Sequence, residues 1–166
     1  MILSDAFLRQ AALAVILVIL TLSLQSAGMA AFVVWIRAYF ARNTSRIGPV
    51  RGAWLMVRIT TLMLILQLLE VMLWAGFYRW KCFPSLEAAL YFSSTSFSTV
   101  GYGDLLLPST WRLLGPIESV TGVLMCGLSA SGLFAIVLRL VQHEERFLPP
   151  LPPLSNAGDS HAFTRA

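Results

Sequence analysis

Three long apolar stretches constrain this chain more than any other feature of its sequence. They run from about Ala11 to Ile36, from Ala53 to Tyr78 and from Leu113 to Leu138. A helix needs about 20 residues, each adding about 1.5 Å, to cross the hydrocarbon core of a bilayer. Only 12% of the 166 residues are charged, against about 25% in soluble domains. The sequence therefore predicts an all-α membrane protein with three transmembrane helices.

A fourth apolar segment, Leu86 to Phe97, is too short to cross the bilayer and is rich in Ser and Thr. Its length, about 12 residues, is typical of a re-entrant helix. Ser85 is placed to cap this helix, and Glu87 lies in its first turn, where a negative charge is favourable. Irregular backbone after such a helix is tolerated only inside protein or beside a water-filled cavity. We therefore expect a re-entrant pore helix followed by a pore loop.

The basic residues predict the orientation of the chain. Residues 37–52 carry four arginines and no acidic residue: Arg37, Arg42, Arg46 and Arg51. Short loops rich in Arg stay on the cytoplasmic side. The N-terminus and the pore segment should then face outward, and the C-terminus should be cytoplasmic. Small size and the lack of regulatory domains favour the inner (plasma) membrane of a prokaryotic cell.

The chain divides into four expected parts. They are an extra transmembrane helix at 1–36, a cytoplasmic basic loop at 37–52, a helix–pore-loop–helix module at 53–141, and a Pro-rich cytoplasmic tail at 142–166. The tail composition predicts disorder. A cleaved signal peptide ending near Ala30 is the alternative for the first part, because small residues precede that position. The apolar run instead continues into the arginine cluster, which favours a retained helix.

The residues after the short segment carry the most specific motif of the chain: Thr99-Val100-Gly101-Tyr102-Gly103-Asp104. This run resembles the signature of the potassium channel superfamily, whose TVGYG loop is a carbonyl-lined selectivity filter. The order of helix, re-entrant segment, filter and helix resembles the pore module of small prokaryotic channels of the ion-channel-2 type. The resemblance covers roughly Ala53 to Val141. An ordinary Gly-rich turn is the alternative, and it fits poorly between two transmembrane helices.

The physics of the motif concerns the backbone. A dehydrated potassium ion needs a shell of oxygen atoms, which neutral carbonyl dipoles supply without holding the ion too tightly. Turning successive carbonyls toward one axis requires positive φ values, which Gly101 and Gly103 adopt at little cost. The resemblance implies that potassium is bound by four carbonyls and the Thr99 hydroxyl, the carbonyls being those of Thr99, Val100, Gly101 and Tyr102. It also implies that the side chains of Val100 and Tyr102 pack behind the filter.

Other residues are expected to support the filter. In the family, the acid that ends the motif, here Asp104, bonds to a donor on the pore helix, and Tyr91 stands at one of the matching positions. Thr95 occupies a position where some relatives carry a Glu. The family also uses a mid-helix glycine as a gating hinge, for which Gly122 is the first candidate and Gly127 the second.

Two acids, Glu70 and Glu118, fall inside transmembrane stretches. Charged groups there usually face protein or water. We expect one or both to bond pore-helix hydroxyls behind the filter, those of Ser93, Ser94 or Thr95. The alternative is that they reach the headgroup region and form no specific contact.

The predicted function is passive, selective conduction of potassium through a homotetramer, because one chain supplies only one of four filter strands. The alternatives are a weakly selective cation channel, a non-conducting modulatory subunit and an integral membrane enzyme. No catalytic constellation is found, so an enzyme is not expected, and neither is any cofactor besides the permeant potassium ion. The expected partners are further copies of the chain and the lipid bilayer, with no nucleic acid and no soluble substrate.

Overall fold

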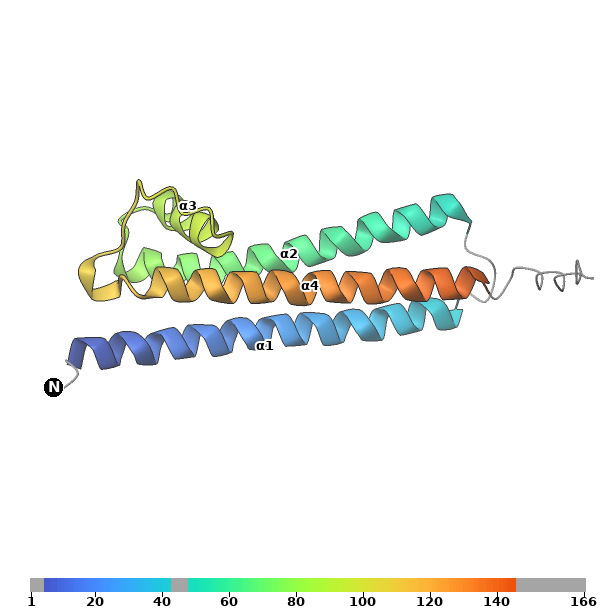
Figure 1. Cartoon of the computed structure of the whole chain (residues 1–166), viewed down its shortest axis with the longest axis horizontal. Coiled ribbons are helices and arrows are strands. Elements are labelled where there is room, and N and C mark those ends of the chain that lie inside the picture. The colour runs from blue at the N-terminus through green and yellow to red at the C-terminus, as the bar shows by residue number, and fades with distance from the viewer. Residues whose placement is uncertain (1–4, 43–47, 146–166) are drawn as a thin grey trace, which may run out of the picture.

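The computed structural model describes residues 5–42 and 48–145, which form helices and loops with no strand. In chain order, the elements are α1 (Asp5–Arg42), α2 (Pro49–Lys81), α3 (Leu86–Phe97), the short 3₁₀ helix η1 (Ser109–Trp111) and α4 (Leu114–Glu145). The helices α1, α2 and α4 lie side by side (Figure 1), with α2 antiparallel to the other two. The short helix α3 lies at the end of the bundle where α2 ends and α4 begins.

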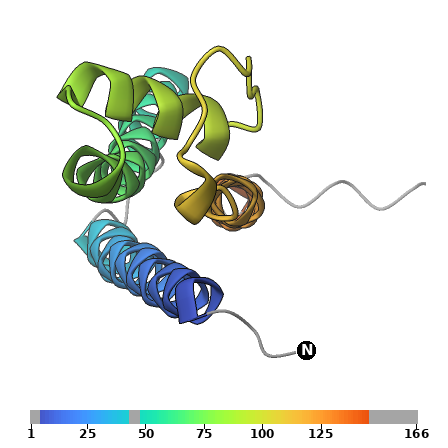
Figure 2. The same ribbon diagram turned by 90° about the vertical axis from the view of Figure 1, so that its left-hand side faces the viewer.

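An end-on view shows that α2 and α4 separate α1 from α3 (Figure 2). Three segments of the described chain are long and apolar enough to cross a membrane: Phe7–Arg42, Val50–Lys81 and Ser109–His143. The number and order of the long helices are thus as predicted, and the architecture is that of an all-α membrane protein.

The predicted helix ends were wrong on the side away from α3. Helix α1 continues to Arg42 and α2 already begins at Pro49, so residues 37–42 and 49–52 of the expected basic loop are helical. Apolar length marks where a helix leaves the hydrocarbon, whereas the helix itself continues through Arg and Ala, which favour it. Pro49 is compatible with the first turn of α2. Arg46 lies outside the described residues.

The end of α4 shows the same error. The expected tail began at residue 142, but α4 continues to Glu145. Residues 146–166, which include the Pro-rich stretch, lie outside the described residues.

Two apolar clusters join α1 to the rest of the bundle, and a smaller third cluster of Val71, Phe97 and Met125 joins α2, α3 and α4. The cluster near α3 joins Trp74 and Tyr78 of α2 to Leu114 of α4 and to Leu17 of α1. The cluster at the opposite end joins Ile59 of α2 to Ile36 and Ile136. Helix α1 therefore contributes buried residues to both of these clusters.

A polar layer lies between the two clusters and ties α1 to the other helices. The Gln25 amide donates a hydrogen bond to the Ser129 hydroxyl of α4 at 3.0 Å, and the Gln67 amide of α2 donates to the same oxygen at 3.2 Å. The Trp74 indole donates to the hydroxyl of Thr21 at 3.0 Å. Such bonds between helices are favourable inside a bilayer, where water does not compete for them.

Candidate functional site

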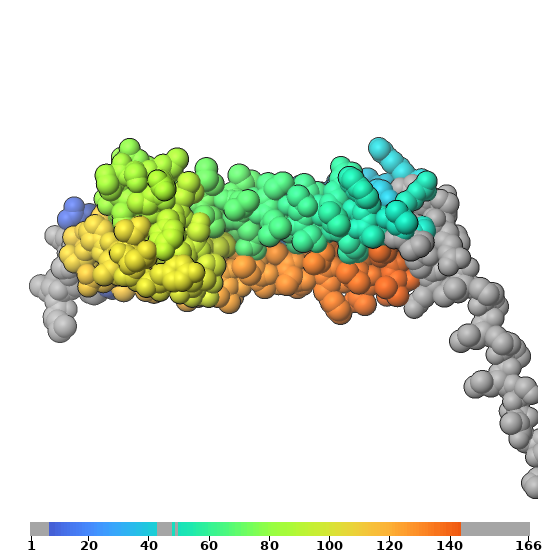
Figure 3. All heavy atoms as spheres, turned by 90° about the horizontal axis from the view of Figure 1, so that it is seen from above, coloured from blue at the N-terminus to red at the C-terminus, as the bar shows by residue number. Residues whose placement is uncertain are grey.

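The helix α3 has the bounds predicted for the pore helix, Leu86–Phe97. Its first turn is capped as expected, because the Ser85 hydroxyl accepts a hydrogen bond from the Ala88 N–H at 3.2 Å. Glu87 lies in the same turn. The C-terminal, partially negative end of the helix therefore leads directly into the motif. Figure 3 shows α3 and the segment that follows it forming the surface at this end of α2 and α4.

The backbone of the motif alternates in handedness. The φ angles are +61° at Thr99, +50° at Gly101 and +78° at Gly103, whereas Val100 and Tyr102 are not in the positive-φ region. Alternation of this kind turns successive peptide groups toward the same side, unlike the opposite sides of a β-strand. The positive φ predicted for the two glycines is confirmed.

Thr99 was not expected to share this conformation. A positive φ is costly for a β-branched residue, and strain of this kind is concentrated at functional sites. The sequence carried no signal for it, because Thr has no intrinsic preference for the left-handed region.

Hydrogen bonds tie the motif to the last turn of α3. The Gly101 N–H donates to the carbonyl of Thr95 at 3.1 Å, and the Thr99 N–H donates to that of Ser96 at 2.9 Å. The Ser119 hydroxyl of α4 donates to the same Ser96 carbonyl at 2.7 Å. The position of α3 therefore fixes the position of the motif, and α4 fixes that of α3.

Asp104 is held by Tyr91, as the sequence suggested. The Tyr91 hydroxyl donates to one oxygen of Asp104 at 2.8 Å, and the Leu105 N–H donates to the other at 3.0 Å. The hydrogen bond to Asp104 raises the pKa of Tyr91 above its ordinary value. The ring of Tyr91 also stacks on that of Tyr102, with centroids 6.5 Å apart.

We expect Tyr91→Phe to leave the fold intact and, if ions pass along the motif as the sequence predicts, to make sustained current decline severalfold faster. The substitution keeps the ring that stacks on Tyr102 and removes the donor to Asp104. Single-channel recording in planar bilayers measures this decline. If the bond is the cause, Asp104→Asn should produce a similar effect, and the double variant should be no worse than either single variant. Additive effects would contradict this explanation.

Thr95 supports the motif through its backbone and not through its side chain. Its hydroxyl donates to the Phe92 carbonyl of its own helix at 2.9 Å, while its carbonyl accepts from Gly101. It makes no bond to Asp104 in the described part of the chain, so the pairing that a Glu provides in some relatives has no side-chain equivalent here.

Glu118 is fully buried and joins three helices. Its carboxylate accepts hydrogen bonds from the Ser93 hydroxyl of α3 at 2.5 Å and from the Tyr78 hydroxyl of α2 at 2.8 Å. Ser93 was one of the three expected hydroxyl partners. Tyr78 was missed, because an aromatic residue near the end of a transmembrane helix is normally an interfacial anchor.

Glu70 is also fully buried, but it does not take part in this network. Neither of its carboxylate oxygens has a hydrogen-bond partner among the residues that the structure describes. The expected contact with pore-helix hydroxyls is therefore made by Glu118 and not by Glu70.

Glu118→Leu should destabilise the protein by about 1–3 kcal/mol per subunit, because it leaves the buried Tyr78 hydroxyl without an acceptor. Ser93 is affected less, since its hydroxyl also lies 3.0 Å from the Val71 carbonyl. Adding Tyr78→Phe should recover part of the loss, since removing both partners is nearly neutral. Thermal unfolding in detergent measures both effects, with Glu70→Gln as the control. A double variant less stable than Glu118→Leu would contradict this assignment.

Gly122 lies where α4 crosses the end of α3. A Cβ atom added here would lie 2.1 Å from the Phe97 carbonyl oxygen and 2.9 Å from its carbon. At Gly127 the same atom would meet open space. Because α4 is one unbroken helix, the geometry gives Gly122 a packing role, and its action as a hinge stays a prediction.

The side chains expected to pack behind the filter are not covered within one chain. Val100 is 52% exposed and Tyr102 is 72% exposed. A single chain therefore presents an uncovered surface on the motif itself.

The comparisons with known proteins agree with this arrangement. A protein-family model described as "Ion channel" matches residues 55–139, which are 85 of the 166 residues and include most of α2, all of α3, the motif and most of α4. Neither the curated proteins nor the solved structures contain a significant match. The chain therefore belongs to this ion channel family of the potassium channel type, and it is a multi-pass membrane protein with a role in ion transport.

Proposed function

We propose that this chain is one subunit of a potassium-selective channel that conducts passively through a tetrameric pore. The observation that carries the proposal is the backbone directly after the negative end of α3, where the positive φ values of Thr99, Gly101 and Gly103 alternate with Val100 and Tyr102, which are not in the positive-φ region. In this arrangement the ion-binding groups are the Thr99 hydroxyl and four carbonyls, those of Thr99, Val100, Gly101 and Tyr102. Neutral carbonyl dipoles replace the hydration shell and still release the ion.

Four copies around one axis would complete the filter, because each chain supplies one strand of it. A homotetramer with cyclic symmetry is the simplest such assembly. The exposure of Val100 and Tyr102 in the single chain supports it, since large exposed apolar or aromatic groups at a functional surface mark an interaction site.

The proposed orientation follows from charge. Arg37 and Arg42 at the end of α1 and Arg51 at the start of α2 lie at the bundle end away from α3. The positive-inside rule favours that end as cytoplasmic. The helix α3 is then a re-entrant pore helix that enters from the outer face. The N-terminus of the chain lies outside and its C-terminus is cytoplasmic. The membrane is the inner membrane of a prokaryotic cell.

Flux measurements on the purified full chain in liposomes test the proposal. Potassium should pass much faster than sodium, and barium should block the flux. Equal potassium and sodium fluxes would indicate a weakly selective cation channel. A stable tetramer without flux would indicate a modulatory subunit, and either result would overturn the proposal.

A further inference from the structure

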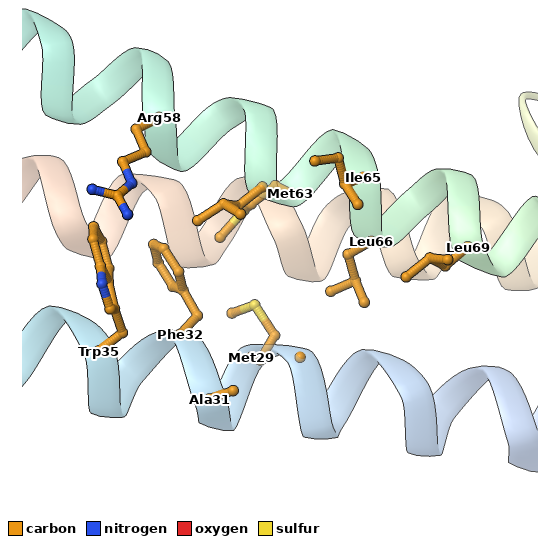
Figure 4. A pocket seen from close by; sticks show the side chains of 11 residues that line it. Met29, Ala31, Phe32, Trp35, Arg58, Met63, Ile65, Leu66 and Leu69 are labelled. Atoms are coloured by element: carbon orange, nitrogen blue, oxygen red, sulfur yellow. The ribbon is translucent and has the colours of Figure 1, made fainter.

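An apolar groove lies between α1 and α2, in the part of the bundle away from α3 (Figure 4). Its volume is about 420 Å³. Met29 and Phe32 line it from α1, and Leu66 and Leu69 line it from α2. The two helices are in close contact at Gly28: a Cβ atom added there would lie only 2.6 Å from the Leu66 side chain. Its rim is apolar and exposed, so in a membrane the groove opens toward lipid.

One end of the groove is polar. Arg58 projects from α2 over the ring of Trp35, with its guanidinium carbon 4.9 Å from the ring centroid. Within the described parts of the chain, Arg58 forms no ion pair with a carboxylate. Trp35 stacks on Tyr39, with centroids 5.9 Å apart. Trp and Tyr collect at the membrane–water interface, so this end of the groove lies near the headgroups and the remainder lies in the hydrocarbon.

We propose that the groove binds an anionic phospholipid from the leaflet beside the α1–α2 connection. The lipid phosphate would accept hydrogen bonds from the Arg58 guanidinium, whose planar donors suit a phosphate. One acyl chain would lie along Phe32, Met29 and Leu66, which follow one another away from Arg58 in Figure 4. A charged end next to a long apolar channel matches the shape and polarity of a lipid. This inference needs only the membrane location of the bundle and does not depend on ion selectivity.

Native mass spectrometry of the full chain in detergent tests this inference. The protein is titrated with dioleoylphosphatidylglycerol or with dioleoylphosphatidylcholine, which have the same acyl chains. A basic residue near an anionic headgroup should favour the anionic lipid by about fivefold. Arg58→Gln should bring both lipids to the same affinity, while Arg58→Lys should retain part of the preference. Arg51→Gln is the matched control, because Arg51 is exposed but lies outside the groove.

A second pair of variants tests the acyl-chain site. Ala31 lies at the exposed rim of the groove, so Ala31→Trp should fill the groove and weaken the binding of both lipids. Val34 is 68% exposed and lies outside the groove, so Val34→Trp should leave the binding of both lipids unchanged. Equal affinity of the unmodified chain for the two lipids would overturn the inference, and so would a lipid preference that survives Arg58→Gln. Loss of the oligomer in Ala31→Trp with unchanged lipid retention would identify the groove as a subunit interface and would also overturn it.

Discussion

Replacing Gly101 with Ala should abolish potassium flux while the transmembrane helices remain folded. Gly101 has a φ of +50°, a conformation that costs an L-residue with a side chain about 1–2 kcal/mol. In a tetramer the cost is incurred four times, which gives roughly 4–8 kcal/mol per filter. Within one chain the added Cβ meets no neighbouring atom within 4 Å, so the expected strain comes from the backbone conformation. The loop would relax and turn one ring of carbonyls away from the axis.

Gly76→Ala is the matched control for this experiment. Gly76 lies in the helix α2, without a positive φ and also with open space around an added Cβ. Flux in this variant should equal that of the unmodified chain. Potassium and sodium flux in liposomes, together with circular dichroism and gel filtration, separates loss of conduction from loss of folding. A Gly101→Ala protein that conducts potassium with unchanged selectivity would contradict the proposed filter.

Local sequence signals predicted α3 better than any other element. Ser85 marked its start through the capping preference, and the change to a Gly-containing run marked its end. The two motif glycines likewise predicted their own positive φ, because glycine adopts it readily. These features depend on chemistry within a few residues, which a single sequence contains.

Features that depend on how helices cross could not be predicted in the same way. Glu70 and Glu118 both lie in apolar helices, and nothing in their local sequence says which one faces α3. The structure shows that the start of α4 approaches the middle of α3, so Glu118 meets Ser93 and also Tyr78 from α2. Such a contact joins residues 25 or 40 positions apart in the chain and is decided by packing.

The helix α1 lies outside the family match, yet its packing links it to the helices inside that match. Gln25 donates to Ser129 in the middle of α4, and Trp74 of α2 donates to Thr21. Both bonds lie well inside the bundle, between residues that are far apart in the sequence. The extra helix is therefore an integral part of the packed bundle, which its place in the sequence alone did not reveal.

Gly122→Ala should destabilise the subunit and impair selectivity together. The added methyl group would lie 2.1 Å from the Phe97 carbonyl oxygen, a backbone atom that cannot rotate away. Overpacking of this kind costs about 1–3 kcal/mol per site. The last turn of α3 would have to move, and the motif would move with it, because Thr99 and Gly101 are bonded to that turn. We therefore expect a lower unfolding temperature and a smaller ratio of potassium to sodium flux.

Gly127→Ala provides the comparison that separates packing from bending. Gly127 has open space around an added Cβ, and alanine favours a helix interior by about 1 kcal/mol over glycine, so thermal stability should be equal or higher. If α4 bends at Gly127, this variant would open less often at unchanged selectivity. A hinge at Gly122 would instead make Gly122→Ala stable and selective but slow to open. Three measurements on both variants distinguish the two roles. A clash changes the unfolding temperature and the flux ratio, whereas a stiffened hinge changes only the open probability.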